Sequence, residues 1–584
     1  MSYINTPKSY GIAALSRVQL LRVIFIILGA ILVSRLFYVQ IIKHDYYQTQ
    51  AEAEHLEQFD ITAPRGLIYM EDGSTAVPVA LNDTRYTIYA DPAYIKNASS
   101  TADKISSLLG VSTQTLTKEL STKNSQYVIL AKKFTKQQAD KITSLQLDGV
   151  GAQQVSIRTY PQGSLAAQVI GFVNDDGQGQ YGVEGYMDSS LTGKTGLEKE
   201  ITDVHGIPLA VNNNNVLVQP QAGKNVTLTL DIGMQNIIEG LLKADVESSK
   251  SIRGTVILMD ANTGAIKAMA NYPTFDPNNF DQVTNDSVFM NTAISLPYEP
   301  GSVMKPLLLG AAFTQGTANP NTSYYDPGYV VVDGSTIINA ENWGAKTMTL
   351  WDVIDDSLNT GAVFVLKTLG GGDINAKAMN TWYTYLTQHY YMGQDTGIQL
   401  SGEAPGYVSS PNSSNDAVIQ YANMAFGQGI TMTPLQLTAA YASIINGGTY
   451  YKPSVIASQD SNGNVSFKPT ILAKNVVSAN ASTEIRAMLQ HSVGINNPAA
   501  QRAGYDIGAK SGTAQIPNGN GGYLTNEFDG SYIGYISGNG VLYIMMVRLD
   551  EPQTAGFASA EAAKVWAKID NALIDNYAIS PKSP

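Results

Sequence analysis

Residues 298–313 read YEPGSVMKPLLLGAAF and place Ser302 three positions before Lys305. Pro300-Gly301 breaks any preceding element, and Pro306 fits only the first turn of a helix, so a helix is expected to begin at about Ser302. The residues that follow are apolar on every face, which predicts a buried helix. Residues three apart are neighbours on a helix, so the Ser302 hydroxyl and the Lys305 amine can come within hydrogen-bonding distance. A serine beside an amine base is the arrangement of an activated nucleophile.

The same pattern also has a purely structural interpretation. Ser302 could simply start a core helix from which the Lys305 amine reaches solvent, since S-x-x-K occurs by chance in many chains. Two later stretches favour the chemical interpretation. The first is Ser357-Leu358-Asn359, which follows a capping-box pattern that opens a short helix at Thr349. The second is Lys510-Ser511-Gly512-Thr513, in a strand-like run that we expect at a sheet edge.

Composition excludes several classes of function. A chain of 584 residues, 44% of them hydrophobic, should fold as several globular domains. Its 37 Lys and Arg against 49 Asp and Glu give a net charge of −12, which disfavours a nucleic-acid partner. There is no cysteine, and the five histidines form no HxH or HExxH pair, so no metal site is expected. Gly193-Lys194-Thr195 lacks the earlier glycine of a phosphate loop, and no cofactor is expected.

The first part of the chain predicts a membrane anchor. An unbroken apolar run from Val23 to Val33 lies within a segment, residues 17–42, that is long enough to cross a bilayer. A cleaved signal peptide or a buried core helix would show a similar run, but no A-x-A site follows it. Basic residues precede the span and acidic residues follow it, which predicts a cytoplasmic tail, residues 1–16, and an extracytoplasmic remainder. The protein is therefore expected to cross the cell membrane once.

The rest of the chain predicts two further domains and a short tail. After the anchor come strand patterns, a hairpin signal at Asp72-Gly73 and two helical stretches near residues 101–109 and 135–146. The sequence pattern changes at residue 222, where strand pairs begin. Similar strand pairs occur near the carboxyl end, with helical stretches between the two regions. This indicates an α+β architecture. The expected domains are 43–221 and 222–577, followed by a tail at 578–584.

In chain order, S-x-x-K, S-x-N and K-[ST]-G form the motif set of penicillin-binding proteins and class A β-lactamases. The chain resembles the class B penicillin-binding proteins, the membrane-anchored peptidoglycan D,D-transpeptidases, from residue 17 onward. Matching segments before residue 222 resemble that family's non-catalytic pedestal (dimerisation-type) domain: Pro64-Arg65-Gly66, Arg158-Thr159-Tyr160-Pro161 and Gly182-Val183-Glu184-Gly185. The resemblance implies an elongated β-rich pedestal and a transpeptidase domain with an antiparallel sheet flanked by helices. Glu299-Pro300-Gly301-Ser302 and Asn359 look more like the division-type branch than the elongation-type branch.

The resemblance also implies the role of each motif residue. Ser302 would attack the D-Ala-D-Ala bond of a stem peptide, with Lys305 as base and Ser357 passing a proton to the leaving amine. Asn359 would hold the substrate backbone, and Lys510, Ser511, Gly512 and Thr513 would bind the terminal carboxylate. β-Lactams would be covalent inhibitors. A separate membrane glycosyltransferase and other division proteins are the expected partners, because class B enzymes polymerise no glycan themselves.

Two other interpretations remain open at this point. The same serine could finish with water, as in a D,D-carboxypeptidase or a β-lactamase, and Glu403 and Glu484 are the only glutamates between Ser357 and Lys510 that could activate it. A catalytically idle scaffold or β-lactam sensor would instead recruit division proteins through the anchor and the pedestal.

Overall fold

The computed structural model describes residues 17–47, 56–61, 63–122, 125, 127–201, 216–412, 417–460, 467–518, 522–553, 556–577 and 579–581. The chain forms two compact units, one of residues 64–193 with 222–584, the other of residues 1–63 with 194–221. The expected tail at 1–16 lies outside the described residues. The expected domain boundaries stay predictions.

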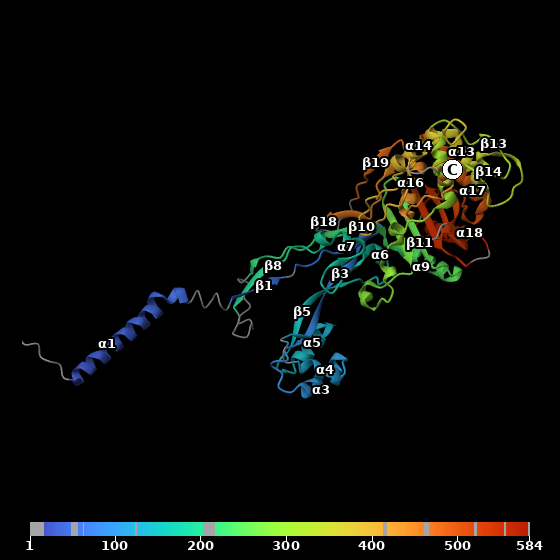
Figure 1. The fold of residues 1–584 in the computed structure, drawn as a ribbon. Helices are drawn as coiled ribbons and strands as arrows, with labels where there is room; N and C mark the ends of the chain where they lie inside the picture. Colours follow the sequence, from blue (N-terminus) through green and yellow to red (C-terminus); the bar gives the residue numbers. More distant parts are fainter. Residues whose placement is uncertain are drawn as a thin grey trace, which may run out of the picture. The chain divides into compact units, whose positions relative to one another are not determined.

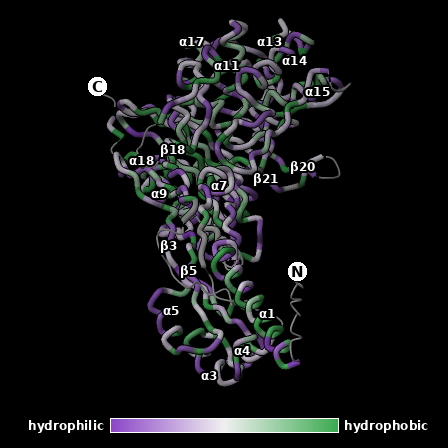
Figure 2. The backbone as a smooth tube through the Cα atoms, turned by 90° about the vertical axis from the view of Figure 1, so that its left-hand side faces the viewer, coloured by the Kyte–Doolittle hydropathy of each residue, from purple (hydrophilic) through white to green (hydrophobic). Residues whose placement is uncertain are grey.

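The smaller unit contains an apolar helix and a small sheet. Helix α1 (Arg17–Phe37) continues into a π-helical turn, η1 (Tyr38–Ile42). It is the one helix of the described chain that is long and apolar enough to cross a membrane, and none of its side chains is buried. Much of its tube is coloured as hydrophobic in Figure 2. The antiparallel sheet of this unit consists of β1 (Leu56–Ile61), β8 (Gly196–Ile201) and β9 (Val216–Val218).

A five-stranded antiparallel sheet forms the centre of the larger unit. Its order is β12 (Ile266–Tyr272), β11 (Arg253–Asp260), β22 (Val541–Asp550), β21 (Tyr523–Gly538) and β20 (Asp506–Pro517). Strands from both ends of this region therefore pair, as the sequence predicts. The helices packed on it are α9 (Ile232–Ser249), α16 (Pro434–Ile445), α17 (Ala479–Asn496) and α18 (Ala558–Asn576). Helix α11 (Lys305–Thr314) packs in turn against α16 and α17. The predicted antiparallel sheet flanked by helices is confirmed (Figure 1).

Between the first two and the last three strands of this sheet, the chain forms further short helices and strands, some of which contribute to the candidate site. The helices are η3 (Pro277–Gln282), η4 (Asp286–Phe289), α10 (Thr292–Ser295), η5 (Gly301–Met304), α12 (Leu350–Asp355), α13 (Asn359–Leu369), α14 (Ala376–Thr384), η6 (Tyr385–His389), α15 (Ala417–Met424) and η7 (Pro498–Ala500). The strands are β13 (Ser323–Asp326), β14 (Tyr329–Val332), β15 (Ser335–Ile338), β16 (Lys346–Thr349), β17 (Thr449–Tyr451) and β19 (Ile471–Lys474).

A second sheet joins residues before and after position 222. Its strands are β18 (Ile456–Asp460), β10 (Asn225–Asp231), β2 (Ile68–Asp72), β3 (Thr75–Ala90), β4 (Val128–Phe134) and β5 (Val150–Thr159). Strand β10 runs parallel to β2, and the other pairs are antiparallel. The helices α3 (Ala98–Leu109), α4 (Thr113–Leu120) and α5 (Lys136–Thr143) share a separate core with β3, β4 and β5. Both views show these helices at the end of the long β3–β5 ribbon (Figures 1 and 2).

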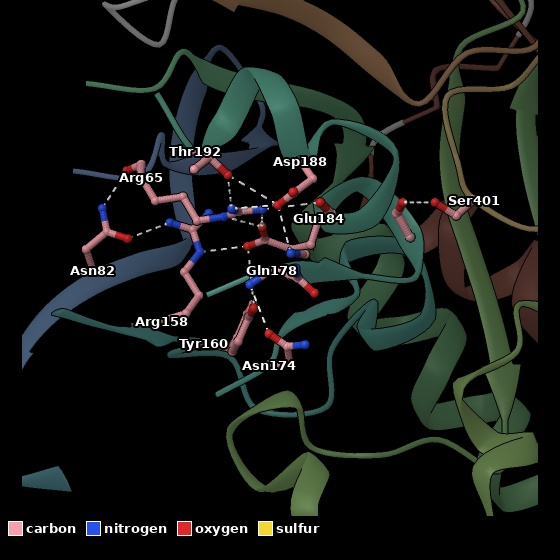
Figure 3. A network of polar contacts seen from close by, with 12 residues as sticks. Arg65, Asn82, Arg158, Tyr160, Asn174, Gln178, Glu184, Asp188, Thr192 and Ser401 are labelled. Atoms are coloured by element: carbon pink, nitrogen blue, oxygen red, sulfur yellow. Dashed lines mark hydrogen bonds and ion pairs between the residues drawn. The ribbon is translucent and has the colours of Figure 1, made fainter. Parts of the chain in front are cut away.

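Short elements after β5 bring three of the resemblance motifs together around one buried carboxylate. These elements are α6 (Ala167–Ile170), β6 (Phe172–Val173), β7 (Gly179–Gln180), α7 (Gly182–Tyr186) and α8 (Asp188–Leu191). The side chain of Glu184 is fully buried and accepts hydrogen bonds from Arg65 Nε at 2.8 Å and Arg158 Nε at 2.6 Å (Figure 3). Arg65 also pairs with Asp188 at 2.8 Å, and Arg158 Nη1 donates to Asn82 Oδ1 at 2.8 Å. Two arginines that are far apart in sequence are thus held by one glutamate.

We expect Glu184→Gln to lower the free energy of unfolding by about 3–5 kcal/mol, because it leaves two buried guanidinium groups without their shared anion. Thermal unfolding of the detergent-solubilised chain measures the loss. Asp140→Asn is the matched control, since the Lys136–Asp140 pair is more than half exposed and such pairs contribute at most about 1 kcal/mol. Equal unfolding temperatures for the two variants would contradict the structural role of Glu184.

Helix α18 carries a buried acid, Asp570, that has no hydrogen-bond partner for either carboxylate oxygen among the described residues. Burial raises its pKa to about 8, well above the value of an unfolded chain. The folded state therefore holds a proton that the unfolded state loses, and stability falls as the pH rises from about 4 to about 8, then stays level.

We expect Asp570→Asn to remove this pH dependence and to stabilise the protein at pH 8 by roughly 2 kcal/mol or more, while changing little at pH 4. Unfolding temperatures at the two pH values test it. Asp575→Asn, on the same helix and exposed beside Arg502, should leave the wild-type profile in place. A wild-type profile for Asp570→Asn would refute a protonated Asp570.

Candidate active site

Ser302 lies in a tight turn that is held by two neighbouring backbones. It occupies the 3-10 turn η5, and α11 begins only at Lys305, so the predicted helix start is three residues early. Gly301 has a φ of +65°, and a Cβ there would lie 2.8 Å from the Thr513 carbonyl oxygen. The Gly301 N–H donates to the Gly427 carbonyl at 3.0 Å. A positive φ and close backbone contact explain why glycine precedes the serine.

The Lys305 amine lies at the centre of the candidate site. Its Nζ is 2.9 Å from Ser302 Oγ, 2.9 Å from Asn359 Oδ1 and 3.3 Å from Ser357 Oγ, and it donates to the Ser357 carbonyl at 2.5 Å. The side chain is buried, with no carboxylate among these contacts. Burial, and then the charge of Lys510, holds the pKa of Lys305 well below its usual value. The amine is therefore biased toward its neutral form.

Ser357 and Asn359 enter the site from the junction of two helices. The predicted capping box is present, with Thr349 and Asp352 closing the first turn of α12. Ser357 adopts a left-handed φ of +55°, and Asn359 opens α13. Asn359 Nδ2 donates to the Ile338 carbonyl at 3.0 Å, which fixes its Oδ1 toward Lys305.

Lys510 approaches from the opposite side, on the edge strand β20. Its Nζ donates to Ser357 Oγ at 3.0 Å and to the Ser511 carbonyl at 3.1 Å. Burial lowers the pKa of Lys510 to about 8, against an opposing effect of the Asp355 charge. Gly512 is required for close packing, since a Cβ there would lie 2.8 Å from the Pro300 carbonyl oxygen.

A cleft of about 460 Å³ exposes this cluster. The candidate residues that line it are Ser302, Ser357, Asn359, Ser511 and Thr513. Lys305 and Lys510 lie behind them, 1% and 2% exposed. The structure therefore brings all eight residues together. The hydroxyl groups line the cleft, and the two buried amines lie within hydrogen-bonding distance of Ser302 Oγ and Ser357 Oγ. Lys194-Thr195-Gly196 also fits the K-[ST]-G pattern, but Lys194 belongs to the other compact unit, where it forms an isolated β-bridge with Gln221.

Two further residues of the site are not predicted by any sequence motif. Ser559, at the start of α18, shares a 2.9 Å hydrogen bond with Thr513 Oγ1. Asp355 lines the cleft and lies 2.9 Å from a ring nitrogen of His491. Neither belongs to a motif. Ser559 reaches the site because α18 packs against β20 and β21, whereas Asp355 ends α12, two residues before Ser357.

Comparison with known proteins identifies the family. Residues 254–569 match the penicillin-binding protein transpeptidase domain, and residues 60–228 match the penicillin-binding protein dimerisation domain. The chain therefore belongs to the penicillin-binding proteins that carry both domains, which is the class B family that the motifs predict.

Similar proteins match this chain over nearly its whole length. The chain is 29% identical to stage V sporulation protein D of Bacillus subtilis, covering 96% of this chain and 86% of that protein. It is 27% identical to the peptidoglycan D,D-transpeptidase FtsI homolog of Mesostigma viride, covering 100% and 98%. The crystal structure of penicillin binding protein 2X from Streptococcus thermophilus superimposes with a TM-score of 0.71 at 25% identity, over 90% of this chain and 81% of that one.

Proposed function

We propose that the protein is a serine D,D-transpeptidase that cross-links peptidoglycan stem peptides at D-Ala-D-Ala. The observation that carries the proposal is the contact between the hydroxyl of Ser302 and the buried amine of Lys305, whose lowered pKa favours the neutral form. The transpeptidase-domain match and the printed name of the FtsI homolog support it.

The contacts of Lys305 support its role as the base. Two of its partners, the Ser357 carbonyl and Asn359 Oδ1, can only accept hydrogen bonds. They use both N–H groups of a neutral amine, and its lone pair is left for the hydroxyls. Ser302 Oγ can then pass its proton to Lys305 Nζ as it forms a bond to the carbonyl carbon of the penultimate D-alanine.

The remaining groups complete the acylation. As the peptide bond breaks, Ser357 Oγ, held by Lys510, relays a proton to the departing amine of the terminal D-alanine. Lys510, Ser511, Gly512 and Thr513 bind its carboxylate, and the backbone N–H groups of Ser302 and Thr513 stabilise the oxyanion. Acylation leaves the stem peptide as an ester on Ser302.

Transfer regenerates the enzyme. The amine of a second stem peptide attacks the ester carbonyl, loses its proton to the lysine–serine relay and forms the cross-link, while the Ser302 hydroxyl recovers its proton. A β-lactam would acylate Ser302 in the same way, but its leaving group stays attached and the ester persists.

The two glutamates that could support hydrolysis have other contacts. Glu403 accepts hydrogen bonds from the backbone of Thr396 and Gly397, and Glu484 pairs with Asn480 on α17. Neither belongs to the lining of the cleft. This favours transfer to an amine over transfer to water.

Product analysis distinguishes a transpeptidase from a carboxypeptidase. Incubation of the protein with paired stem pentapeptides should yield cross-linked dimers with release of D-alanine, detected by mass spectrometry. Shortened monomers alone would establish a carboxypeptidase. Restoration of growth by a Ser302→Ala protein in depleted cells would establish a scaffold or sensor instead.

We also propose that the chain crosses the cell membrane once, with residues 1–16 cytoplasmic and the catalytic unit extracytoplasmic. The apolar α1 and the basic residues that precede its centre support this orientation. We propose further that it works with a separate glycosyltransferase and other membrane proteins of cell division, which the FtsI-like name of a relative supports.

Because the chain has no cysteine, one introduced thiol reports the orientation without background. A Ser99→Cys protein, altered at an exposed position of α3, should react in intact spheroplasts with a membrane-impermeant maleimide. Labelling that requires permeabilised cells would reverse the proposed topology. A Ser9→Cys protein, altered in the amino-terminal tail, should show the opposite pattern.

A further inference from the structure

The hairpin of β14 and β15 exposes an apolar face beside the cleft. Tyr329, Val331 and Ile338 share this face and are 52%, 55% and 62% exposed, whereas Val332 and Ile337 on the other face are buried. Asp333 and Gly334 both have positive φ, as in the tight turns that favour two-stranded hairpins. Single exposed apolar residues are common, but three on one face mark a contact surface.

Hydrogen bonds tie this hairpin to the catalytic asparagine. Tyr329 lies opposite Ile338 in the strand register, and the Ile338 carbonyl accepts from Asn359 Nδ2. At the base of the hairpin, the buried Asp326 accepts from Asn339 Nδ2 at 3.1 Å and from the hydroxyl of Thr360. The exposed face is thus held at a fixed place relative to the site.

The surface is also continuous with the cleft. Ala340, Glu341 and Trp343, which follow β15, line the same cleft as Ser302. Trp343 is 40% exposed, with the Lys346 amine 5.4 Å from its ring centre. A substrate whose D-Ala-D-Ala end lies at Ser302 and which leaves the cleft past Ala340 and Trp343 would reach the hairpin.

We propose that the hairpin face of Tyr329, Val331 and Ile338, with Trp343, binds the amino-sugar chain to which the stem peptides are attached. The proposal rests on the proposed function, whose substrate continues from the stem peptide into a glycan. Aromatic rings and branched aliphatic side chains fit the apolar C–H faces of pyranose rings, and the three residues of the face carry no charge that would favour an ionic partner. The surface would select polymerised, glycan-bearing substrate over free stem peptide.

The test compares two substrates and two double variants of the full-length protein. Tyr329→Thr with Val331→Thr removes one aromatic and one aliphatic side chain from the contact surface but keeps residues that favour strands. The matched control is Tyr127→Thr with Ile129→Thr, a tyrosine and a branched aliphatic residue two positions apart that are 48% and 43% exposed in the pedestal. The substrates are uncross-linked glycan chains bearing pentapeptides and the free pentapeptide.

We expect the hairpin variant to cross-link glycan chains about three- to tenfold more slowly, the effect of losing one aromatic contact and one smaller apolar contact. Its turnover of free pentapeptide and its acylation by labelled penicillin should match those of the control variant. Equal losses on both substrates, or no loss on glycan chains, would overturn the proposal. A loss seen only when a glycosyltransferase is present would assign the surface to a protein partner and overturn the glycan assignment. Failure of the wild type to acylate with penicillin would instead refute the proposed function.

Discussion

Ser302→Ala is expected to abolish covalent labelling by penicillin and to lower cross-linking by roughly 10⁴-fold or more, as removal of a serine nucleophile does in other acyl-transfer enzymes. The hydroxyl lies 2.9 Å from the Lys305 amine and at the surface of the cleft, so its loss removes the attacking atom without opening a cavity in the core. We expect the unfolding temperature to change little.

Fluorescent penicillin followed by gel electrophoresis measures the labelling, and mass spectrometry of the adduct locates it. Ser492→Ala is the matched control, since Ser492 lines the same cleft but belongs to none of the three motifs. It should label at close to the wild-type rate. Covalent labelling of Ser302→Ala would show that another residue is the nucleophile.

Lys305→Arg is expected to slow acylation by about 10³-fold across the pH range, since a guanidinium keeps its proton and cannot act as a base. In the wild type, the rate should rise with pH as Lys305 loses its proton, at a pH well below the usual range for lysine. It should fall again above about pH 8, where Lys510 loses the charge that binds the substrate carboxylate. The profile should therefore be bell-shaped.

Stopped-flow acylation between pH 5 and pH 10, values chosen to bracket both groups, gives the two limbs. Lys267→Arg serves as the control: Lys267 is largely buried in the same unit, where it pairs with Glu71. It should retain the wild-type profile. An unchanged rate for Lys305→Arg would exclude the lysine as base.

The parts of the fold that are local in sequence could be predicted. The hairpin at Asp72-Gly73 and the capping box at Thr349 both form where their residues indicate. Such features depend on a few adjacent residues. Helix α4 was not predicted, because its threonine-rich sequence has low helix propensity and it is stabilised by Leu116 and Leu120 packing in the core of its subdomain.

The long apolar helix α1 and the order of the motifs could also be predicted from the sequence, but the spatial arrangement of the motifs could not. The relation of Ser302 to Lys305 follows from their spacing within about one turn of helix. The distance from Lys510 to Ser357 depends on β20 lying at the sheet edge beside η5, which is set by pairing of strands far apart in the chain.

Residue identities and short spacings are enough to predict which chemical groups the protein has, their order along the chain and the class to which it belongs. The tertiary structure brings three pedestal motifs together at Glu184 and places an apolar hairpin at the border of the cleft. It also decided the protonation bias of Lys305, because burial and the proximity of Lys510, rather than any neighbour in sequence, make the charged form of its amine unfavourable.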